Sequence, residues 1–408
     1  MKKIISFLGT TRYECVKYYY ENIEVETKFI QECVYKILNI KEDEKPMLLI
    51  GLTERARQTN WPELKQILDS NNYLYTEISI NDGKDDMELW DNFDLLYNYI
   101  DKEDEVYFDV THSYRSIPLM VMSVLNYAKF IKNINVREIF YGAFEAKDEK
   151  NRAPVFNLSV FNQITDWTIA SEKFLETGDS RALARILKSE INPILREKND
   201  KSEYAKLVNE VSIKLEQFSA ALYTVRGNEI SKIGLQLRKA LEKIKDEELE
   251  IISLIPFNKI LNVIYDKVQY FSGDIVLDIH NTVKICKEFN LIQQAYTFIL
   301  ENIINYLCVK GSFEIYNEKT REKIARVVSG KITHGKKREE DFDSEKANIE
   351  IELKNYITED LVKLFGDLGV TFRNDINHAG FRSNAMGSTK FSNRLEDFIG
   401  RFESIIGI

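Results

Sequence analysis

Arg373 and His378 combine residue types and a spacing that suit the cleavage of RNA. They stand at the two ends of the hexapeptide RNDINH. Histidine titrates near neutral pH, so it can take a proton from a ribose 2′-hydroxyl or give one to the leaving 5′-oxygen. Arginine stays charged and can hold a phosphate through two hydrogen bonds while negative charge develops on it. RNA carries its own nucleophile, so this chemistry needs no metal ion.

The geometry of a regular helix works against this pair. Residues five apart on a helix point about 140° away from each other. The pair therefore makes a workable site only if the helix is distorted, or if a second copy of the chain supplies the opposing wall across a two-fold axis. An arginine followed by a histidine at this spacing also arises by chance about 0.5 times in such a chain. A surface arginine and histidine beside a helix exit is the alternative.

Two loops near the N-terminus carry groups that suit an anionic ligand. The first, GTTRY at residues 9–13, follows an apolar strand and offers two hydroxyls, backbone amides and a cation. The second, DVTHSYRS at residues 109–116, gathers hydroxyls, an imidazole and a guanidinium where a helix begins. The free N–H groups and the dipole of a helix start favour an anion.

The same loops have a plainer interpretation. Thr111, Ser113 and Ser116 would then only cap the helix, and His112 would be satisfied locally. Neither loop is GxGxxG or GxxxxGK[ST], so a conventional dinucleotide site or a Walker-type triphosphate site is not expected. In open parallel sheets, however, ligands bind outside the carboxyl ends of the strands. Two such loops at one sheet edge favour a phosphate-bearing ligand.

The elements that must position these loops alternate along residues 1–160. Near-continuous apolar strands separated by helices are typical of a parallel sheet covered on both faces. We therefore predict an α/β, doubly wound, Rossmann-like domain. The predicted strands are Lys3–Gly9, Met47–Leu52, Leu74–Ile80, Val106–Val110 and Arg137–Phe144, and the predicted helices are Val25–Asn39, Trp61–Asn71, Asp86–Ile100 and Ser116–Ile131.

The pattern becomes helical from about residue 162 and stays so to the C-terminus. All three tryptophans lie before Glu172, and no proline follows Pro256. We expect a helical connector over residues 161–200 and an all-α domain over residues 201–408. His280 lies in a helical pattern and is expected to be structural. His334 lies in a basic stretch that could touch an RNA backbone or be an ordinary solvated loop.

Composition excludes several classes of protein. The chain has 408 residues, 44% of them hydrophobic, and a formal net charge of −9, which argues against a surface that coats nucleic acid. No apolar run approaches the roughly 20 residues that cross a bilayer, and the N-terminus lacks a signal-peptide pattern, so we expect a cytoplasmic protein without membrane contact. The four cysteines are far apart, which predicts buried free thiols. No metal or cofactor motif is present.

Both ends of the chain together resemble the CRISPR-associated DxTHG-motif family, whose members join an N-terminal CARF domain to a C-terminal HEPN ribonuclease domain. SFLGTTRY at residues 6–13 resembles the first strand and loop of that family, and DVTHSYRSIP at residues 109–118 resembles its name-giving motif. RNDINH matches the HEPN R-x4-6-H motif, including the polar residue after the arginine. Thr11 and Ser113 stand where many relatives have glycine, so side chains occupy positions where backbone approaches the ligand.

The resemblance implies a metal-independent endoribonuclease of type III CRISPR antiviral defence that a second messenger switches on. A cyclic oligoadenylate would bind across a dimer of CARF domains, and the paired HEPN domains would then cut single-stranded RNA. The products would be a 2′,3′-cyclic phosphate and a 5′-hydroxyl. The implied ligand-binding residues are Gly9, Thr10, Thr11, Arg12, Thr111, His112, Ser113 and Arg115, and the implied catalytic residues are Arg373, Asn374 and His378.

Several points stay open at the level of sequence. The resemblance implies a homodimer or a higher even oligomer. A two-fold ligand suits a two-fold dimer, so cyclic tetra-adenylate is the ring size we expect, although cyclic hexa-adenylate satisfies the same symmetry. One alternative function is a CARF sensor whose helical domain has no RNase activity. Another is a ring nuclease, in which Thr10 or Thr11 positions the attacking 2′-hydroxyl of the cyclic ligand itself.

Overall fold

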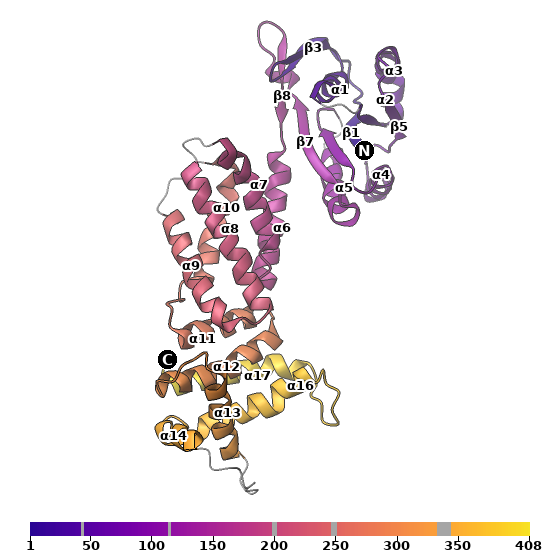
Figure 1. Cartoon of the computed structure of the whole chain (residues 1–408). Helices are drawn as coiled ribbons and strands as arrows, with labels where there is room; N and C mark the ends of the chain where they lie inside the picture. The colour runs from indigo at the N-terminus through magenta and orange to yellow at the C-terminus, as the bar shows by residue number, and fades with distance from the viewer. Residues whose placement is uncertain (42–44, 113–115, 198–201, 246–250, 333–343) are drawn as a thin grey trace. The chain divides into compact units, whose positions relative to one another are not determined.

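The computed structural model describes residues 1–41, 45–112, 116–197, 202–245, 251–332 and 344–408 (Figure 1). The chain divides into two compact units, an N-terminal unit of Met1–Thr165 and a C-terminal unit of Asp166–Ile408. The first is a mixed α/β domain and the second is helical, so the predicted fold class is confirmed. No helix in the described part of the chain is long and apolar enough to span a bilayer.

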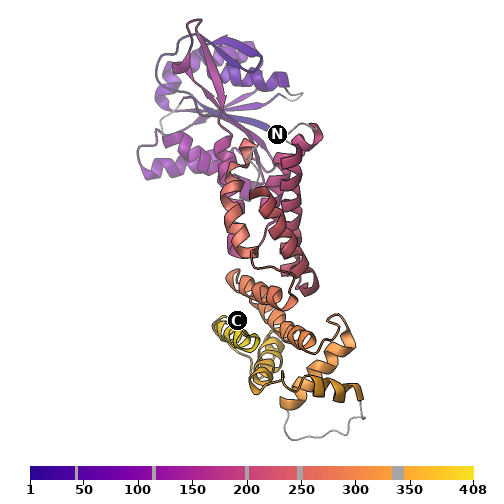
Figure 2. The same cartoon turned by 90° about the vertical axis from the view of Figure 1, so that its left-hand side faces the viewer.

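The five predicted strands form a continuous parallel run in the order β7-β6-β1-β4-β5. The central strands β1 and β4 are almost entirely buried because the sheet has helices on both faces, as Figures 1 and 2 show. The pleat sends alternate side chains to opposite faces, so Ile4 joins one hydrophobic core and Ile5 the other. The strands are β1 (Lys2–Phe7), β4 (Met47–Leu52), β5 (Tyr75–Ser79), β6 (Glu105–Asp109) and β7 (Asn135–Gly142).

Three further strands, which the sequence analysis missed, make the sheet mixed rather than parallel. They are β2 (Val16–Tyr20), β3 (Ile23–Thr27) and β8 (Arg152–Asn157). β2 and β3 form an antiparallel hairpin, and β8 pairs antiparallel with β7 and parallel with β2. The prediction of a helix over Val25–Asn39 is therefore wrong at its start. Alternate burial along Ile23–Thr27 is the two-residue period of a strand, which the neighbouring helical pattern conceals.

Helices cover the two faces of this sheet with separate cores. α1 and α3 pack with Leu48 and Tyr107 on one face. α4 and α5 pack with Leu49 and Phe108 on the other face. The helices are α1 (Ile30–Lys41), α2 (Glu54–Thr59), α3 (Trp61–Ser70), α4 (Asp86–Asn98) and α5 (Ser116–Lys132).

The described residues of the C-terminal unit share one large hydrophobic core, to which helices from α6 to α17 contribute. α8 packs against both α7 and α9, and α11 packs against α12. α6 (Val160–Thr177) begins just before the boundary between the two units. The other helices are α7 (Arg181–Glu197), α8 (Ser202–Tyr223), α9 (Gly227–Lys245), α10 (Ile255–Val268), α11 (Ile275–Glu288), α12 (Ile292–Lys310), α13 (Glu318–Ile332), α14 (Ser344–Glu352), α15 (Glu359–Gly366), α16 (Asn374–Asn377) and α17 (Thr389–Ile406).

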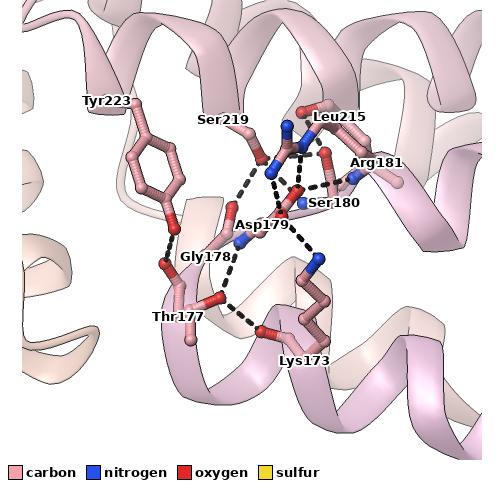
Figure 3. Close-up of polar contacts among 9 residues, drawn as sticks. All are labelled: Lys173, Thr177, Gly178, Asp179, Ser180, Arg181, Leu215, Ser219 and Tyr223. Carbon is pink, nitrogen blue, oxygen red and sulfur yellow. Dashed lines mark hydrogen bonds and ion pairs between the residues drawn. The ribbon is translucent and has the colours of Figure 1, made fainter. Parts of the chain in front are cut away.

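The turn between α6 and α7 holds a polar cluster that the sequence analysis does not single out (Figure 3). The buried carboxylate of Asp179 accepts hydrogen bonds from the guanidinium of Arg181 and pairs with the ammonium of Lys173 at 2.9 Å. These cations hold the pKa of Asp179 well below its usual range. The hydroxyl of Ser219 on α8 donates to the carbonyl of Gly178 at 2.5 Å. The cluster therefore holds the turn against α8, and this structural role accounts for its buried charge.

The predictions for the cysteines and for His280 have different outcomes. Cys33, Cys286 and Cys308 are buried, but Cys15 is exposed because it lies in the loop before β2, so the prediction of buried thiols is wrong for Cys15. His280 is 1% exposed, and its Nε2 lies 2.9 Å from a carboxylate oxygen of Glu403 on α17, which is the structural role expected for it. His334 lies outside the described residues.

Candidate functional sites

A pocket of about 190 Å³ lies where β1 and β6 end, and both predicted loops line it. Gly9, Thr10 and Thr11 come from the loop after β1, and Thr111 and His112 come from the loop after β6. The two strands are parallel neighbours, so their carboxyl ends meet at the same sheet edge. The structure therefore brings five of the predicted ligand-binding residues to one cavity.

The other three predicted ligand-binding residues are Arg12, Ser113 and Arg115. Arg12 is exposed and does not line the pocket, and it makes no hydrogen bond or ion pair with the described residues. Its guanidinium is therefore available to a ligand larger than the pocket. Ser113 and Arg115 lie outside the described residues.

Two side chains that the sequence analysis did not select hold the first loop. The backbone N–H of Gly9 donates to the hydroxyl of Tyr13 at 2.7 Å. The side-chain amide of Asn60, between α2 and α3, donates to the carbonyls of Gly9 at 2.9 Å and Thr11 at 2.8 Å. A β-carbon at Gly9 would lie only 2.8 Å from the Tyr13 hydroxyl, so a larger residue there would break this arrangement. No sequence signal marks Asn60, because it acts across 49 residues of chain.

The second loop is anchored by Asp109, whose side chain is fully buried at the end of β6. Its carboxylate accepts hydrogen bonds from the Ser6 hydroxyl at 2.6 Å and from the backbone N–H of Thr111 at 3.0 Å. Burial raises the pKa of Asp109, and these hydrogen bonds oppose the rise. The Thr111 hydroxyl donates to Asp109 and accepts from the backbone N–H of Gly142 on β7. Thr111 is thus engaged in holding the loop and has no proton left for a ligand.

His112 lies against the wall of the pocket and is neutral. Its ring stacks on that of Tyr13, with centroids 4.2 Å apart and planes 17° from parallel. Burial lowers the pKa of His112 to about 4, because the charged imidazolium would lose its hydration. Its Nε2 is buried and has no partner among the described residues. An unsatisfied ring nitrogen beside a pocket can accept a hydrogen bond from a ligand or donate one to it, according to its tautomer.

The RNDINH segment lies where one long helix changes its winding. α15 is followed by a π-helical stretch over Asp367–Arg373, then by α16, and His378 is the C-cap. π-helical turns are rare and occur frequently at functional sites. The distortion therefore lies before Arg373, whereas the residues between the pair, Asn374–Asn377, are α-helical, so the distorted helix that the spacing requires is not found between Arg373 and His378.

Arg373 and His378 lie in different surroundings within one chain. Arg373 is half-buried and lines a cavity of about 560 Å³, where its Nη2 lies 4.0 Å from a carboxylate oxygen of Glu301 on α12. His378 is exposed and does not line that cavity. Asn374 is half-buried, and its carbonyl accepts the backbone N–H of His378 at 3.1 Å.

Asp375 is a residue of this segment that the sequence analysis passed over. It is 3% exposed, and its carboxylate accepts the backbone N–H of Met386 at 2.9 Å. Its carbonyl accepts the backbone N–H of Gly380 at 3.1 Å, which closes the helix end with Ala379 in the left-handed region. Asp375 therefore fixes the loop that follows His378. In the described part of the chain, no three His, Cys, Asp or Glu side chains are arranged to hold a metal ion.

Two parts of the chain match families of known proteins. Residues 3–145 match the CARF domain of the CRISPR system endoribonuclease Csx1, and residues 163–271 match the second domain of CRISPR-associated protein MJ1674. The MJ1674 protein of Methanocaldococcus jannaschii is 27% identical over 314 residues, which cover 72% of this chain and 48% of that protein. The chain thus spans about half the length of the curated relative it matches.

These matches bear on the two candidate sites unequally. The pocket at the ends of β1 and β6 lies inside the matched CARF range, whereas Arg373 and His378 lie beyond both matched ranges. The predicted boundaries of the connector and of the HEPN domain stay predictions. The chain is a CRISPR-associated protein that carries a CARF domain, as its sequence motifs indicated.

Proposed function

We propose that the chain is an endoribonuclease that a cyclic oligoadenylate activates. The observation that carries this proposal is the pocket at the ends of β1 and β6. Thr10, Thr11 and His112 line it, in a region that matches the CARF domain of an endoribonuclease family. Hydroxyls and backbone amides at the carboxyl edge of a sheet suit the phosphates of such a ligand.

The size of the pocket supports a ligand that extends beyond one chain. A cavity of about 190 Å³ accommodates about one nucleobase rather than a whole cyclic oligonucleotide. A two-fold dimer would present this pocket twice to one ring, and the exposed Arg12 would reach its phosphates. The proposed ring is therefore of even size, with cyclic tetra-adenylate as the first candidate.

The proposed chemistry belongs to Arg373 and His378. In the reaction, the ribose 2′-oxygen attacks the adjacent phosphorus as its proton leaves to a general base, and the bond to the 5′-oxygen breaks as that oxygen gains a proton. Histidine suits either proton transfer, and arginine suits the charge on the phosphate. Since His378 is exposed and Arg373 lies in a cavity, the proposal places the working pair across a dimer rather than within one chain.

The test is cleavage of a fluorescent single-stranded RNA by the full chain. It is assayed with cyclic tri-, tetra- and hexa-adenylate, each with and without EDTA. We expect cleavage that rises with one even-sized ring, survives EDTA and ends in a 2′,3′-cyclic phosphate. Absence of cleavage under all six conditions, with ligand binding intact, would overturn the proposed nuclease.

A regulator without nuclease activity is the second candidate function. It is favoured by the separation of Arg373 from His378 within the chain and by the net charge of −9. Tight binding of a cyclic oligoadenylate with no RNA turnover would support this function. Ring cleavage by the CARF domain predicts linear products when the ligand is incubated with a chain that carries Arg373→Ala and His378→Ala.

A further inference from the structure

The cavity that contains Arg373 is assembled from segments far apart in the sequence. α9 contributes Asn228, α12 contributes Glu301, and the loop before α13 contributes Tyr316. Buried Phe298 and Phe365 form an apolar part of the wall. Its volume of about 560 Å³ is within the range of small-molecule sites and is ample for one nucleoside.

One side of the cavity is rigid and polar. The guanidinium of Arg321 donates to the side-chain carbonyl of Asn305 at 2.7 Å, to the carbonyl of Ile315 at 3.1 Å and to Glu301 Oε2 at 2.9 Å. These bonds leave Glu301 Oε1 as the acceptor that faces Arg373, 4.0 Å away. The Nε of Arg373 is itself buried and has no partner among the described residues. Among the described residues, Glu301 Oε1 thus makes no hydrogen bond and is left as an acceptor on this side of the cavity.

The rim carries two features that suit a ligand. The ring of Tyr316 is 68% exposed, so one face of it is available for stacking. Val225, which also lines the cavity, has φ of 55°. A β-branched residue in the left-handed region is a genuine conformational outlier, and such strain gathers at ligand clamps and active sites.

The charges of the lining favour a base over a phosphate. Three carboxylates, those of Glu301, Glu318 and Glu322, face two guanidiniums, and Arg321 is already bonded. A second phosphate would be repelled here, whereas a carboxylate accepts hydrogen bonds from the amino group of a nucleobase. Adenine, guanine and cytosine carry such an amino group, but uracil does not.

We propose that this cavity binds the nucleobase next to the phosphate held by Arg373, and that it prefers bases with an amino group over uracil. The base stacks on Tyr316, and its amino group donates to Glu301. This inference rests on the proposed nuclease function for its position beside the cleaved bond. The binding of the base can be measured without cleavage.

The test uses the full chain and fluorescein-labelled 2′-O-methyl hexamers of A, G, C and U, which lack the attacking hydroxyl. Binding is followed by fluorescence anisotropy. We expect the U hexamer to bind about fivefold more weakly than the A hexamer. Tyr316→Ala should weaken binding of the A hexamer about tenfold, since stacking on an aromatic ring contributes strongly to single-strand binding. Glu301→Gln should bring the A-to-U ratio below about twofold.

The matched control is Tyr270→Ala, which removes an aromatic ring that is 66% exposed and does not line the cavity. Asn228→Ala, at an exposed position on the rim, replaces Glu301→Gln if that variant fails to fold. Equal effects of Tyr316→Ala and Tyr270→Ala would overturn the inference, and so would equal affinity for the A and U hexamers. If the hexamers bind in the expected order but RNA is never cut, the base pocket stands and the proposed nuclease does not.

Discussion

The pocket of the N-terminal unit and the RNDINH segment of the C-terminal unit show two ways of assembling a site. At the sheet edge, Gly9 and His112 lie more than 100 residues apart in sequence, yet parallel strands bring their loops together. On the helix, Arg373 and His378 are only five residues apart, yet one lies in a cavity and the other is exposed. A sheet edge makes distant loops converge, whereas a helix separates near neighbours.

The two sites also differ in what holds them. Asn60, Tyr13 and Asp109 fix the loops of the pocket through hydrogen bonds within the N-terminal unit. Around Arg373, Phe372 stacks on Tyr296 of α12 and Asp375 holds the loop after His378, but these contacts leave His378 exposed. We therefore expect each chain to hold the loops of its own pocket, with one ring bound across two such pockets, and we expect the second site to need a second copy for its chemistry.

The largest expected effect is on RNA cleavage. Arg373→Ala or His378→Ala should each lower the cleavage rate by about 10²–10³-fold, because each removes a proton-transfer or charge-stabilising group. Binding of cyclic tetra-adenylate should stay unchanged, since neither residue lies in the N-terminal unit. Rates from a fluorescent RNA and ligand affinities from calorimetry provide the two measurements.

A mixture of the two variants tests whether the pair works across the dimer. If each working pair takes Arg373 from one subunit and His378 from the other, a dimer of one variant with the other keeps one of its two pairs intact. Random exchange makes half of the dimers mixed, so about a quarter of the wild-type activity should return. A pair within one chain would recover none. If no activity returns, the partner subunit does not supply the second residue of the pair.

The next effect is on the stability of the N-terminal unit. Asp109→Ala leaves the Ser6 hydroxyl and the Thr111 backbone N–H without their acceptor in a buried site, which should lower the free energy of unfolding by about 3 kcal/mol. Trp61 and Trp90 lie in this unit, so denaturant unfolding followed by tryptophan fluorescence reports the loss. Asp101→Asn is the matched control, because the side chain of Asp101 is 79% exposed. A similar loss in both variants would contradict the role given to Asp109.

The sequence predicted the parallel strands and the two ligand loops because these depend on local apolar runs and on a general rule for sheet edges. β2 and β3 escaped prediction because only pairing between strands distinguishes Ile23–Thr27 from the helix that follows. Asn60 and Glu301 escaped because each acts on a loop or side chain more than 15 residues away in sequence. The π-helical turn before Arg373 escaped prediction because weak helix formers such as Val370 and Thr371 do not distinguish a π-helical turn from an α-helical one.

A moderate effect on ligand affinity is expected when the support of the first loop by Asn60 is removed. Asn60→Ala removes two hydrogen bonds to the carbonyls of Gly9 and Thr11, so the loop must be ordered when the ligand binds. We expect the affinity for cyclic tetra-adenylate to fall about tenfold and the free energy of unfolding to fall less than in Asp109→Ala, since each such bond contributes about 1 kcal/mol. Asn71→Ala, which loses a bond to Ile67 at the end of α3, is the control. An unchanged affinity would mean that the loop needs no support from Asn60.

The smallest expected effect is the pH dependence of stability, which compares His112 of the N-terminal unit with the buried His280 of the C-terminal unit. Burial lowers the pKa of His112 to about 4, below the value of about 6.5 in the unfolded chain, so below pH 6.5 the unfolded state binds the proton first. Stability is then lost as the pH falls, by about 1 kcal/mol between pH 6.5 and 5.5. Burial also lowers the pKa of His280, but the carboxylate of Glu403 opposes that shift, so the C-terminal unit should lose less. His112→Gln should abolish the pH dependence of the N-terminal unit over this range, and an undiminished dependence would place its origin elsewhere.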